Sequence, residues 1–351
     1  MNLRLKIALE LERLRRKNLQ ALHPLEQLFW ESTLRCNVNC RHCGSDCLAS
    51  VTQKDMPKDD FLKVIDEEIT PHVDPHRVMI VISGGEPLMR TDLEEVGRAL
   101  YDRGYPWGFV TNGLALTPER FRACRKAGLR SMSVSLDGTE EDHIWMRRHP
   151  KAFEGACRAI SLAAAEKGFT WDVVTCVNRR NINHLDEIRD LLVRLGCRHW
   201  RLVTIDPMGR AKDDPDLLIT DAEFTQLMDY IEANRPMASY SCEGFLGDRE
   251  MKVRNHMYLC VAGVTTASIL IDGSISACTS IRGKYYQGNI YKDHFWDIWE
   301  NGFESYRNRK WMREKEPCDQ CKMFRYCEGN GMHLRREDGS LMMCHYHKLV
   351  R

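Results

Sequence analysis

The spacing of the cysteines constrains this chain more than any other feature of its sequence. Of the 15 cysteines in 351 residues, four lie between residues 36 and 47, and seven lie after residue 240. A cysteine content of about 4% is below that of a small disulfide-stapled scaffold. The N-terminal segment alternates charged residues with leucine and lacks the apolar core of a signal peptide. We therefore expect a cytoplasmic protein with reduced thiols, in which two dense cysteine groups indicate metal sites.

Charge and hydropathy exclude several classes of protein. The net charge of +1 gives no global basic field, which argues against a nucleic-acid partner. The longest apolar runs are about five residues, too short for a transmembrane helix. A hydrophobic fraction of 43% is ample for a packed core. The composition thus predicts a globular protein.

A regular alternation of strand and helix patterns runs from residue 29 to residue 234. Short apolar runs typical of buried strands alternate with segments of helical periodicity. One helix is expected to begin at a capping box from Thr91 to Glu94, and another at Thr117. The predicted strands are 29–34, 78–83, 107–111, 132–136, 171–177 and 199–205. The predicted helices begin at residues 57, 91 and 117 and cover 152–166, 183–195 and 221–234.

Six βα units in about 205 residues predict an α/β fold, a parallel sheet curved into a partial (β/α)6 TIM-type barrel. After residue 240 the chain becomes rich in cysteine, with a β-hairpin expected around Asp272-Gly273. Metal binding lets such a small unit fold with little core. The expected domains are an N-terminal amphipathic helix (1–28), the barrel (29–238) and a small Cys-rich iron–sulfur domain (239–351). For the helix, packing on the body of the protein is favoured over contact with a membrane.

Three cysteines follow the first predicted strand directly. Cys36, Cys40 and Cys43 lie at the end of a barrel strand, where barrel enzymes place their chemistry. Three thiolates hold three irons of a four-iron cluster and leave the fourth iron open for a substrate or cofactor. Zinc is the alternative, with Cys47 or His42 as the fourth ligand. The spacing favours iron–sulfur.

With this loop the sequence resembles the radical S-adenosylmethionine (SAM) superfamily. The resemblance extends to Ser83-Gly84-Gly85-Glu86-Pro87 after the second predicted strand. It implies that the three cysteines bind a 4Fe–4S cluster and that Gly84, Gly85 and Glu86 hold the amino group of SAM. It implies further cofactor-binding roles for Asn112, Ser135, Asp137 and Arg147, with Arg147 pairing with the SAM carboxylate. Turn formation is the alternative role for Asn112 and Asp137.

The C-terminal cysteines resemble the SPASM auxiliary-cluster module of radical SAM enzymes. Structural zinc is again the alternative, but the N-terminal loop favours iron–sulfur. The resemblance implies a complete cluster on Cys318, Cys321, Cys327 and Cys344. It implies a second, nearer cluster on Cys242, Cys260 and Cys278.

The nearer cluster is short of one cysteine ligand. Gly331 stands where the SPASM pattern has a cysteine, and two full clusters need about eight thiolates where this chain supplies seven. The missing ligand is Cys47, a histidine (His256 or His333), water or the substrate, unless the nearer site is degenerate. An occupied site with an unusual or open position is favoured.

The resemblance implies an enzyme that cleaves SAM reductively to a 5′-deoxyadenosyl radical and abstracts hydrogen from a substrate. Its cofactors are SAM, the 4Fe–4S cluster and one or two auxiliary clusters. A ribosomally made peptide is the favoured substrate, to be crosslinked, epimerised or oxidised, with an external flavodoxin- or ferredoxin-type reductant. Tetrapyrrole, quinone-cofactor or sulfatase-type maturation is the alternative, and a zinc-stapled binding protein is the alternative of another class. No residue identifies a catalytic acid or base; Asp206, Tyr285 and Tyr286 are noted for their location alone.

Overall fold

The computed structural model describes residues 3–241 and 243–350. Its strands form one sheet in the order β10-β9-β8-β1-β2-β3-β4-β5-β6-β7. All neighbours from β8 to β7 are parallel, and β9 and β10 continue the sheet as antiparallel strands. The strands are β1 (Gln27–Thr33), β2 (Met79–Gly84), β3 (Trp107–Thr111), β4 (Leu129–Ser135), β5 (Thr170–Val177), β6 (Trp200–Thr204), β7 (Ala238–Tyr240), β8 (Thr266–Ile269), β9 (Ser274–Ser276) and β10 (Gly288–Asn289).

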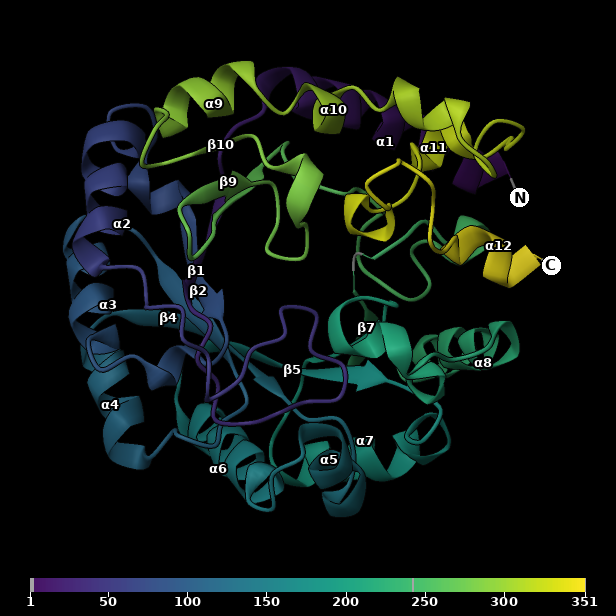
Figure 1. The fold of residues 1–351 in the computed structure, drawn as a ribbon. Helices are drawn as coiled ribbons and strands as arrows, with labels where there is room; N and C mark the ends of the chain where they lie inside the picture. The colour runs from purple at the N-terminus through teal and green to yellow at the C-terminus, as the bar shows by residue number, and fades with distance from the viewer. Residues whose placement is uncertain (1–2, 242, 351) are drawn as a thin grey trace.

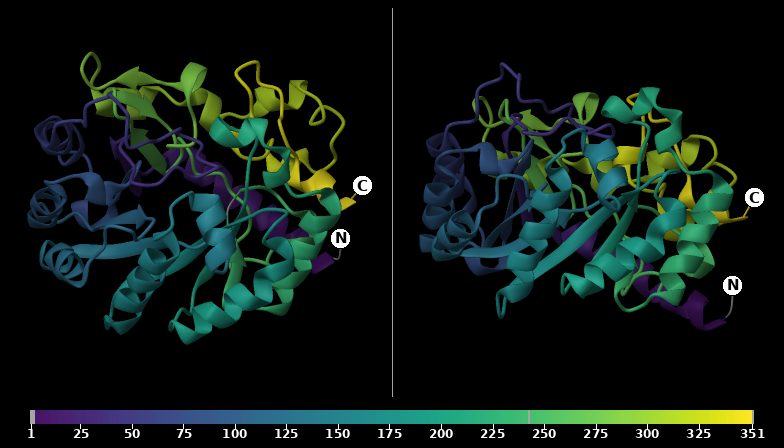
Figure 2. Two further views of the ribbon diagram at one scale, coloured as in Figure 1. Left: turned by 60° about the horizontal axis from the view of Figure 1, so that its bottom comes forward. Right: turned by 90° about the horizontal axis from the view of Figure 1, so that it is seen from below.

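Helices cover the convex side of the sheet, and the C-terminal third of the chain closes over its open side (Figures 1 and 2). The strand–helix order confirms the predicted α/β fold with a partial TIM-type barrel. No described helix is long and apolar enough to cross a membrane. The helices are α1 (Leu3–Leu22), α2 (Lys58–Val64), α3 (Leu93–Asp102), α4 (Pro118–Lys126), α5 (Glu140–Arg147), α6 (Ala152–Ala165), α7 (Leu185–Arg194), α8 (Asp221–Ala233), α9 (Phe295–Asn301), α10 (Glu304–Arg307), α11 (Phe324–Cys327) and α12 (His345–Val350).

Local sequence signals explain the starts of two helices. The Thr117 side chain accepts from the Arg120 N–H at the start of α4, and a capping box of Thr220 with Glu223 begins α8. The capping box expected at Thr91 was wrong, because Asp92 is the N-cap of α3 and makes no capping bond. The guanidinium of Arg90 takes both Asp92 oxygens instead, at 2.9 and 2.8 Å.

The C-terminal unit joins the barrel through a shared strand. β8 pairs in parallel with β1, and β1 pairs on its other side with β2. The hairpin expected around Asp272-Gly273 is present as β8 and β9, but its parallel pairing with β1 was not predicted. The short strand β7 and the helix α5 were also missed; β7 spans the boundary expected at residue 238.

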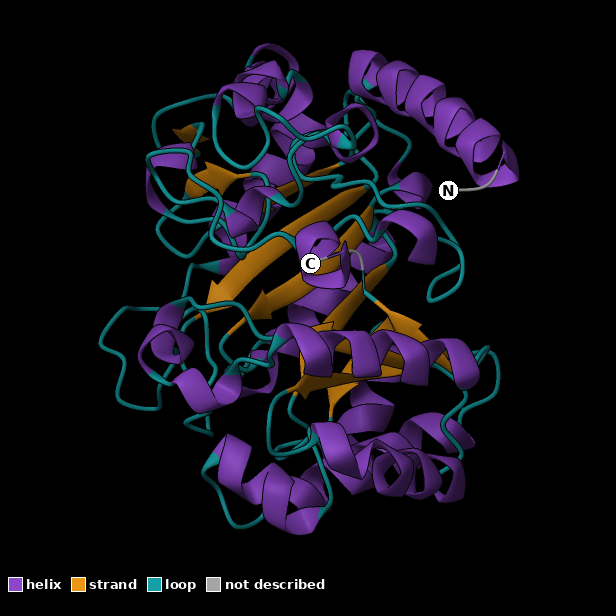
Figure 3. Ribbon diagram, turned by 90° about the vertical axis from the view of Figure 1, so that its right-hand side faces the viewer, coloured by secondary structure: helices purple, strands orange, loops and turns teal. Residues whose placement is uncertain are grey.

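Helix α1 runs along one edge of the molecule and lies against the C-terminal unit (Figure 3). Its buried residues are Leu9 and Arg16, and the Arg16 guanidinium donates to the Tyr258 carbonyl at 2.9 Å. Glu10 accepts from the Tyr326 hydroxyl at 2.7 Å. These contacts attach the helix to the body of the protein, by one face.

Candidate active site

A cavity of about 300 Å³ opens at the carboxyl ends of strands β1 to β4. Parallel strands end at the same edge of a sheet, so residues that follow different strands meet there. Six of the seven predicted cofactor-binding residues line this cavity together with the predicted cysteine loop. The lining includes Cys36, Cys40, Cys43, Cys47, Gly84, Gly85, Glu86, Asn112, Ser135 and Arg147.

The loop that carries the cysteines is held in place through its backbone. Arg41 N–H donates to the Met146 carbonyl of α5 at 2.9 Å. The Arg210 guanidinium donates to the carbonyl of Cys40 at 2.7 Å and to that of Cys47 at 3.2 Å. Arg210 lies after β6 in a short 3-10 helix, Gly209–Asp213, and no motif around it predicts its role. Its contacts fix the loop over the strand ends.

The three thiols of the loop lie in different electrostatic surroundings. Burial raises the pKa of Cys36 to about 12 and raises that of Cys40. The pKa of Cys43 is lowered to about 5, first by a hydrogen bond from the Cys47 thiol and then by the Cys47 N–H, 3.4 Å from the sulfur. Cys47 is thus a hydrogen-bond partner of Cys43 within the same cavity.

The two glycines after β2 let the backbone approach the end of β1 closely. A Cβ on Gly84 would stand 2.1 Å from the Thr33 carbonyl oxygen, and one on Gly85 would stand 2.2 Å from the Arg35 oxygen. Gly84 also has a φ of +119°, which a side chain would strain. Because side chains are excluded here, the peptide groups themselves form this wall of the cavity.

Glu86 is buried, and hydrogen bonds fix its carboxylate. Oε1 accepts from the Thr111 hydroxyl at 2.8 Å and from the Leu88 N–H at 3.2 Å, and Oε2 accepts from the Asn112 N–H at 2.8 Å. Burial, the largest effect, raises the pKa of the carboxyl. The Asn112 side chain donates to Asn37 at 2.8 Å, which ties the end of β3 to the cysteine loop. Ser135 ends β4 at the cavity wall.

Asp137 does not line the cavity, in contrast to its predicted contact with the cofactor. It is fully buried behind Arg147, whose Nε donates to Oδ2 at 2.6 Å, and its Oδ1 accepts from the Cys176 N–H at 3.0 Å. Since both oxygens are engaged, the carboxylate orients Arg147. Arg147 also donates to the Cys40 sulfur at 3.5 Å. The neighbouring carboxylate raises the pKa of this buried guanidinium against the effect of burial.

An ion pair between the barrel and the C-terminal unit was not predicted. Glu31 on β1 is fully buried and pairs with Arg282, which lies after the hairpin. Arg282 also donates to the Ser45 hydroxyl of the cysteine loop at 2.9 Å. The available signal was the position of Glu31 beside Phe29 and Trp30 in a predicted buried strand, because a buried carboxylate needs a partner.

The four cysteines Cys318, Cys321, Cys327 and Cys344 line one small cavity in the C-terminal unit. The Arg335 guanidinium donates to the Cys318 sulfur at 3.2 Å. Burial, with Cys344 and Cys318 close by, raises the pKa of Cys327. Four converging sulfurs from three separate turns are a suitable donor set for a cluster.

Cys260 and Cys278 both lie near Tyr306. Both thiols act electrostatically on the Tyr306 hydroxyl and help burial to raise its pKa. Cys242, the third predicted ligand here, lies outside the described residues. His256 is on the surface, and Cys47 is at the first cavity, so neither of these two candidates for the missing ligand lies beside Cys260.

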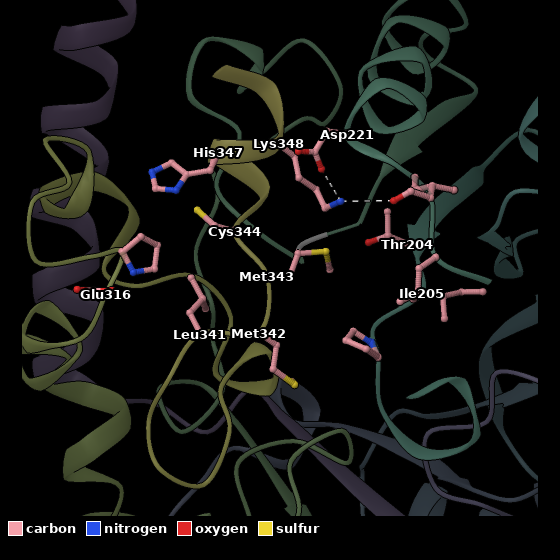
Figure 4. A pocket seen from close by; sticks show the side chains of 14 residues that line it. Thr204, Ile205, Asp221, Glu316, Leu341, Met342, Met343, Cys344, His347 and Lys348 are labelled. Carbon is pink, nitrogen blue, oxygen red and sulfur yellow. Dashed lines mark hydrogen bonds and ion pairs between the residues drawn. The ribbon is translucent and has the colours of Figure 1, made fainter. Parts of the chain in front are cut away.

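Two larger cavities lie in a row with the cavity of the active site. One of about 850 Å³ lies between the cysteine loop and the C-terminal unit and shares Gly44, Ser45 and Thr279 with the first cavity. The other, of about 490 Å³, shares Met342 with the second and runs beside Cys344 and Lys348 (Figure 4). The three cavities thus lie in a row, and each shares lining residues with the next.

The first cavity fits the groups that the sequence implied. Three thiols come from one short loop. The wall formed by Gly84 and Gly85 has no side chains, so a ligand can approach its peptide groups closely. A fixed carboxylate and a fixed guanidinium stand where an amino acid's ammonium and carboxylate groups would need partners.

Comparisons with known proteins agree with this geometry. Residues 30–192 match the radical SAM superfamily, and residues 260–322 match the iron–sulfur cluster-binding domain SPASM. The chain is 26% identical to an AdoMet-dependent heme synthase of Methanosarcina barkeri over 86% of this chain and 89% of that one. It is 29% identical to the mycofactocin maturase MftC of Mycolicibacterium smegmatis, over 87% and 77%. Among solved structures, anSMEcpe with bound AdoMet shares the fold at a TM-score of 0.73, with 19% identity over 93% and 95%.

These matches decide against the alternative of a zinc-stapled binding protein, because both cysteine groups fall in or beside domains that hold iron–sulfur clusters. The cofactors of such a chain are SAM, a 4Fe–4S cluster and auxiliary iron–sulfur clusters. The chain thus carries a radical SAM domain over residues 30–192 and a SPASM domain over residues 260–322.

Proposed function

We propose that this protein modifies a ribosomally made peptide by radical chemistry. When bound, the cluster and SAM supply a 5′-deoxyadenosyl radical that removes a hydrogen atom from an unactivated C–H bond. An external one-electron donor of the flavodoxin or ferredoxin type supplies the electron. The free cysteines suit a reducing cytoplasm, where we place the protein.

The residues of the first cavity have distinct roles in this proposal. Cys36, Cys40 and Cys43 hold the cluster. The peptide groups of Gly84 and Gly85 and the carboxylate of Glu86 hold the SAM ammonium group, since this carboxylate is already fixed by three hydrogen bonds.

The remaining residues position the other end of the cofactor. Arg147 pairs with the SAM carboxylate while Asp137 fixes the orientation of its guanidinium. Asn112 and Ser135 contact the cofactor from the ends of β3 and β4. The cavity wall keeps water and stray hydrogen donors from the reacting atoms.

The observation that carries the peptide assignment is the row of three neighbouring cavities. A compact metabolite fills one pocket of a few hundred Å³, whereas here three spaces of about 490, 850 and 300 Å³ lie side by side with shared lining residues. An extended chain fits such a path and reaches the cysteine loop with one side chain. Among proteins with this fold, anSMEcpe has been solved with a bound peptide.

A second candidate, maturation of a tetrapyrrole, is favoured by one specific observation. The cavity of about 850 Å³ is lined by Lys212, Arg335 and Arg336 against the carboxylate of Glu337, beside Arg282, which is paired with Glu31. Such a lining suits a substrate with several carboxylate side chains. The resemblance to AdoMet-dependent heme synthases agrees with this candidate.

The test is anaerobic turnover with dithionite and SAM. We expect the wild type to form 5′-deoxyadenosine, and Cys36→Ala to form none and to lose about four of about 12 irons. Cys157→Ala on α6 is the matched control and should keep activity and iron. No 5′-deoxyadenosine from a wild type with intact clusters would refute the assignment. A precursor peptide and a carboxylated tetrapyrrole, compared by mass spectrometry, decide between the substrates.

A further inference from the structure

We propose that the imidazole of His333 is an iron ligand of the nearer auxiliary cluster, in place of the cysteine that the SPASM pattern has at position 331. The inference rests on the proposed function, because it requires that the cluster beside Cys260 and Cys278 is present. It resolves the shortage of one ligand at that site with a residue of this chain.

The ring of His333 stands where a side chain at position 331 would be. A Cβ built on Gly331 would lie 2.6 Å from Cε1 and 2.9 Å from Nδ1 of this ring. A cysteine at 331 and the imidazole in its present place therefore exclude each other. Because residue 331 is a glycine, the imidazole of His333 can occupy the space that a cysteine side chain at 331 would fill.

The orientation of the ring suits a metal ligand. Nε2 lies 3.4 Å from Oδ2 of Asp206, a carboxylate at the end of β6. Metal-binding histidines typically give their second ring nitrogen to such a carboxylate, which leaves the first nitrogen for the metal. Among the described residues, Nδ1 of His333 has no hydrogen-bond partner. The free nitrogen is also the one beside Gly331.

The segment that carries His333 contacts Cys260, one of the cysteines of the nearer site. The N–H of Met332, its neighbour in the chain, donates to the sulfur of Cys260. Arg309 donates to the Cys260 carbonyl at 3.2 Å and to the Asn330 carbonyl at 3.1 Å, which holds the two segments together. His333 also shares a cavity wall with Thr279, the residue after Cys278.

The replacement changes the charge of the donor set. A neutral imidazole in place of a thiolate removes one negative charge, and histidine ligation raises the reduction potential of iron–sulfur clusters. The nearer cluster is therefore expected to be a better electron acceptor than one with four thiolates. Its position beside the 850 Å³ cavity places that acceptor next to the substrate.

The experiment is pulsed EPR on the reduced, cluster-loaded full-length protein. We expect a strong coupling from a directly bound nitrogen, which changes on labelling the protein with 15N-histidine. His333→Ala should lose this coupling, with or without about four of about 12 irons. His256→Ala, which removes a surface histidine, should keep it. A wild type without the coupling, or its persistence in His333→Ala, would overturn the inference.

A second variant separates ligation from folding. His333→Cys should keep about 12 irons, lose the nitrogen coupling and lower the potential of the nearer cluster. An unchanged potential with the coupling retained would overturn the inference. The formation of 5′-deoxyadenosine reports on the first cavity alone, so its absence refutes the proposed function, while the nitrogen coupling still decides the role of His333.

Discussion

Replacing Arg282 by methionine should destabilise the whole protein, although the residue lies outside the barrel. Arg282 neutralises Glu31, whose side chain has no exposed surface on β1. Without the guanidinium, the remaining described partner of this carboxylate is the Ile271 N–H at 3.2 Å. The variant therefore leaves a buried and poorly compensated charge at the strand shared by the barrel and the C-terminal unit.

The size of the effect follows from the burial of the pair. Removing one partner of a buried ion pair costs about 3–5 kcal/mol. The Arg282 side chain is 35% exposed, which places the expected loss at the lower end, about 3 kcal/mol. With an unfolding entropy of about 2.1 cal/mol/K per residue, this lowers the Tm of a 351-residue chain by about 4 °C.

The assay is thermal unfolding of the cluster-loaded protein under argon, followed by circular dichroism. Arg122→Met is the matched control, because its partner Glu119 and Arg122 itself are both largely exposed. This surface pair is worth about 0–1 kcal/mol, so the control should shift Tm by about 1 °C or less. Glu31→Gln combined with Arg282→Met should recover part of the loss, since no buried charge remains.

Equal Tm values for Arg282→Met and Arg122→Met would refute this reasoning. They would mean that the Glu31 carboxylate finds water or another partner when the guanidinium is gone. A double variant no more stable than Arg282→Met would contradict the assignment of the loss to the uncompensated charge.

Three further perturbations address the first cavity and its support. Gly85→Ala should weaken SAM binding about tenfold by equilibrium dialysis, because its Cβ has no room beside the end of β1; unchanged binding would contradict the close approach. Asp137→Asn should raise the KM for SAM about tenfold with iron content unchanged, since Arg147 loses a charged partner; a fall in iron instead would make Asp137 a cluster-supporting residue. Burial lowers the pKa of His143 to about 4, against the opposing effect of Asp137 and with that of Arg147 and His42. The unfolded chain therefore binds a proton at His143 more readily than the folded protein does. As the pH falls from 6.5 toward 4, this lowers the free energy of unfolding, by about 2 kcal/mol at pH 5. His143→Gln should flatten this part of the urea-unfolding profile, and the exposed His184→Gln should not.

The barrel was predictable from sequence because its signals are local. Most of the buried strands contain apolar runs, and most α/β connections are short, apart from those after β1 and β6. The capping box predicted at Thr91 does not form. The Asp92 carboxylate at the start of this helix instead accepts hydrogen bonds from Arg90, which is stacked over Trp30. β7 is too short, at three residues, to give a periodic pattern.

Parallel strands end at one edge of a sheet. This rule predicts that one cavity brings together the cysteine loop, the glycine pair, Asn112 and Ser135, as the structure shows. Long-range contacts were beyond that rule. Nothing in the pattern of residues places Asp137 behind Arg147 or pairs Glu31 with Arg282. Each of these contacts joins side chains whose partners depend on the tertiary packing.

The parallel pairing of β1 with β8 has a consequence for the synthesis of this protein. β1 ends at Thr33, and its partner begins at Thr266, so the ribosome must add more than two hundred residues before that edge is covered. At about 5–20 residues per second, this takes about 12–45 s. Throughout that interval a largely buried strand presents an unpaired edge, the geometry from which intermolecular sheets start. The protection of this edge therefore waits until the ribosome has made the C-terminal unit.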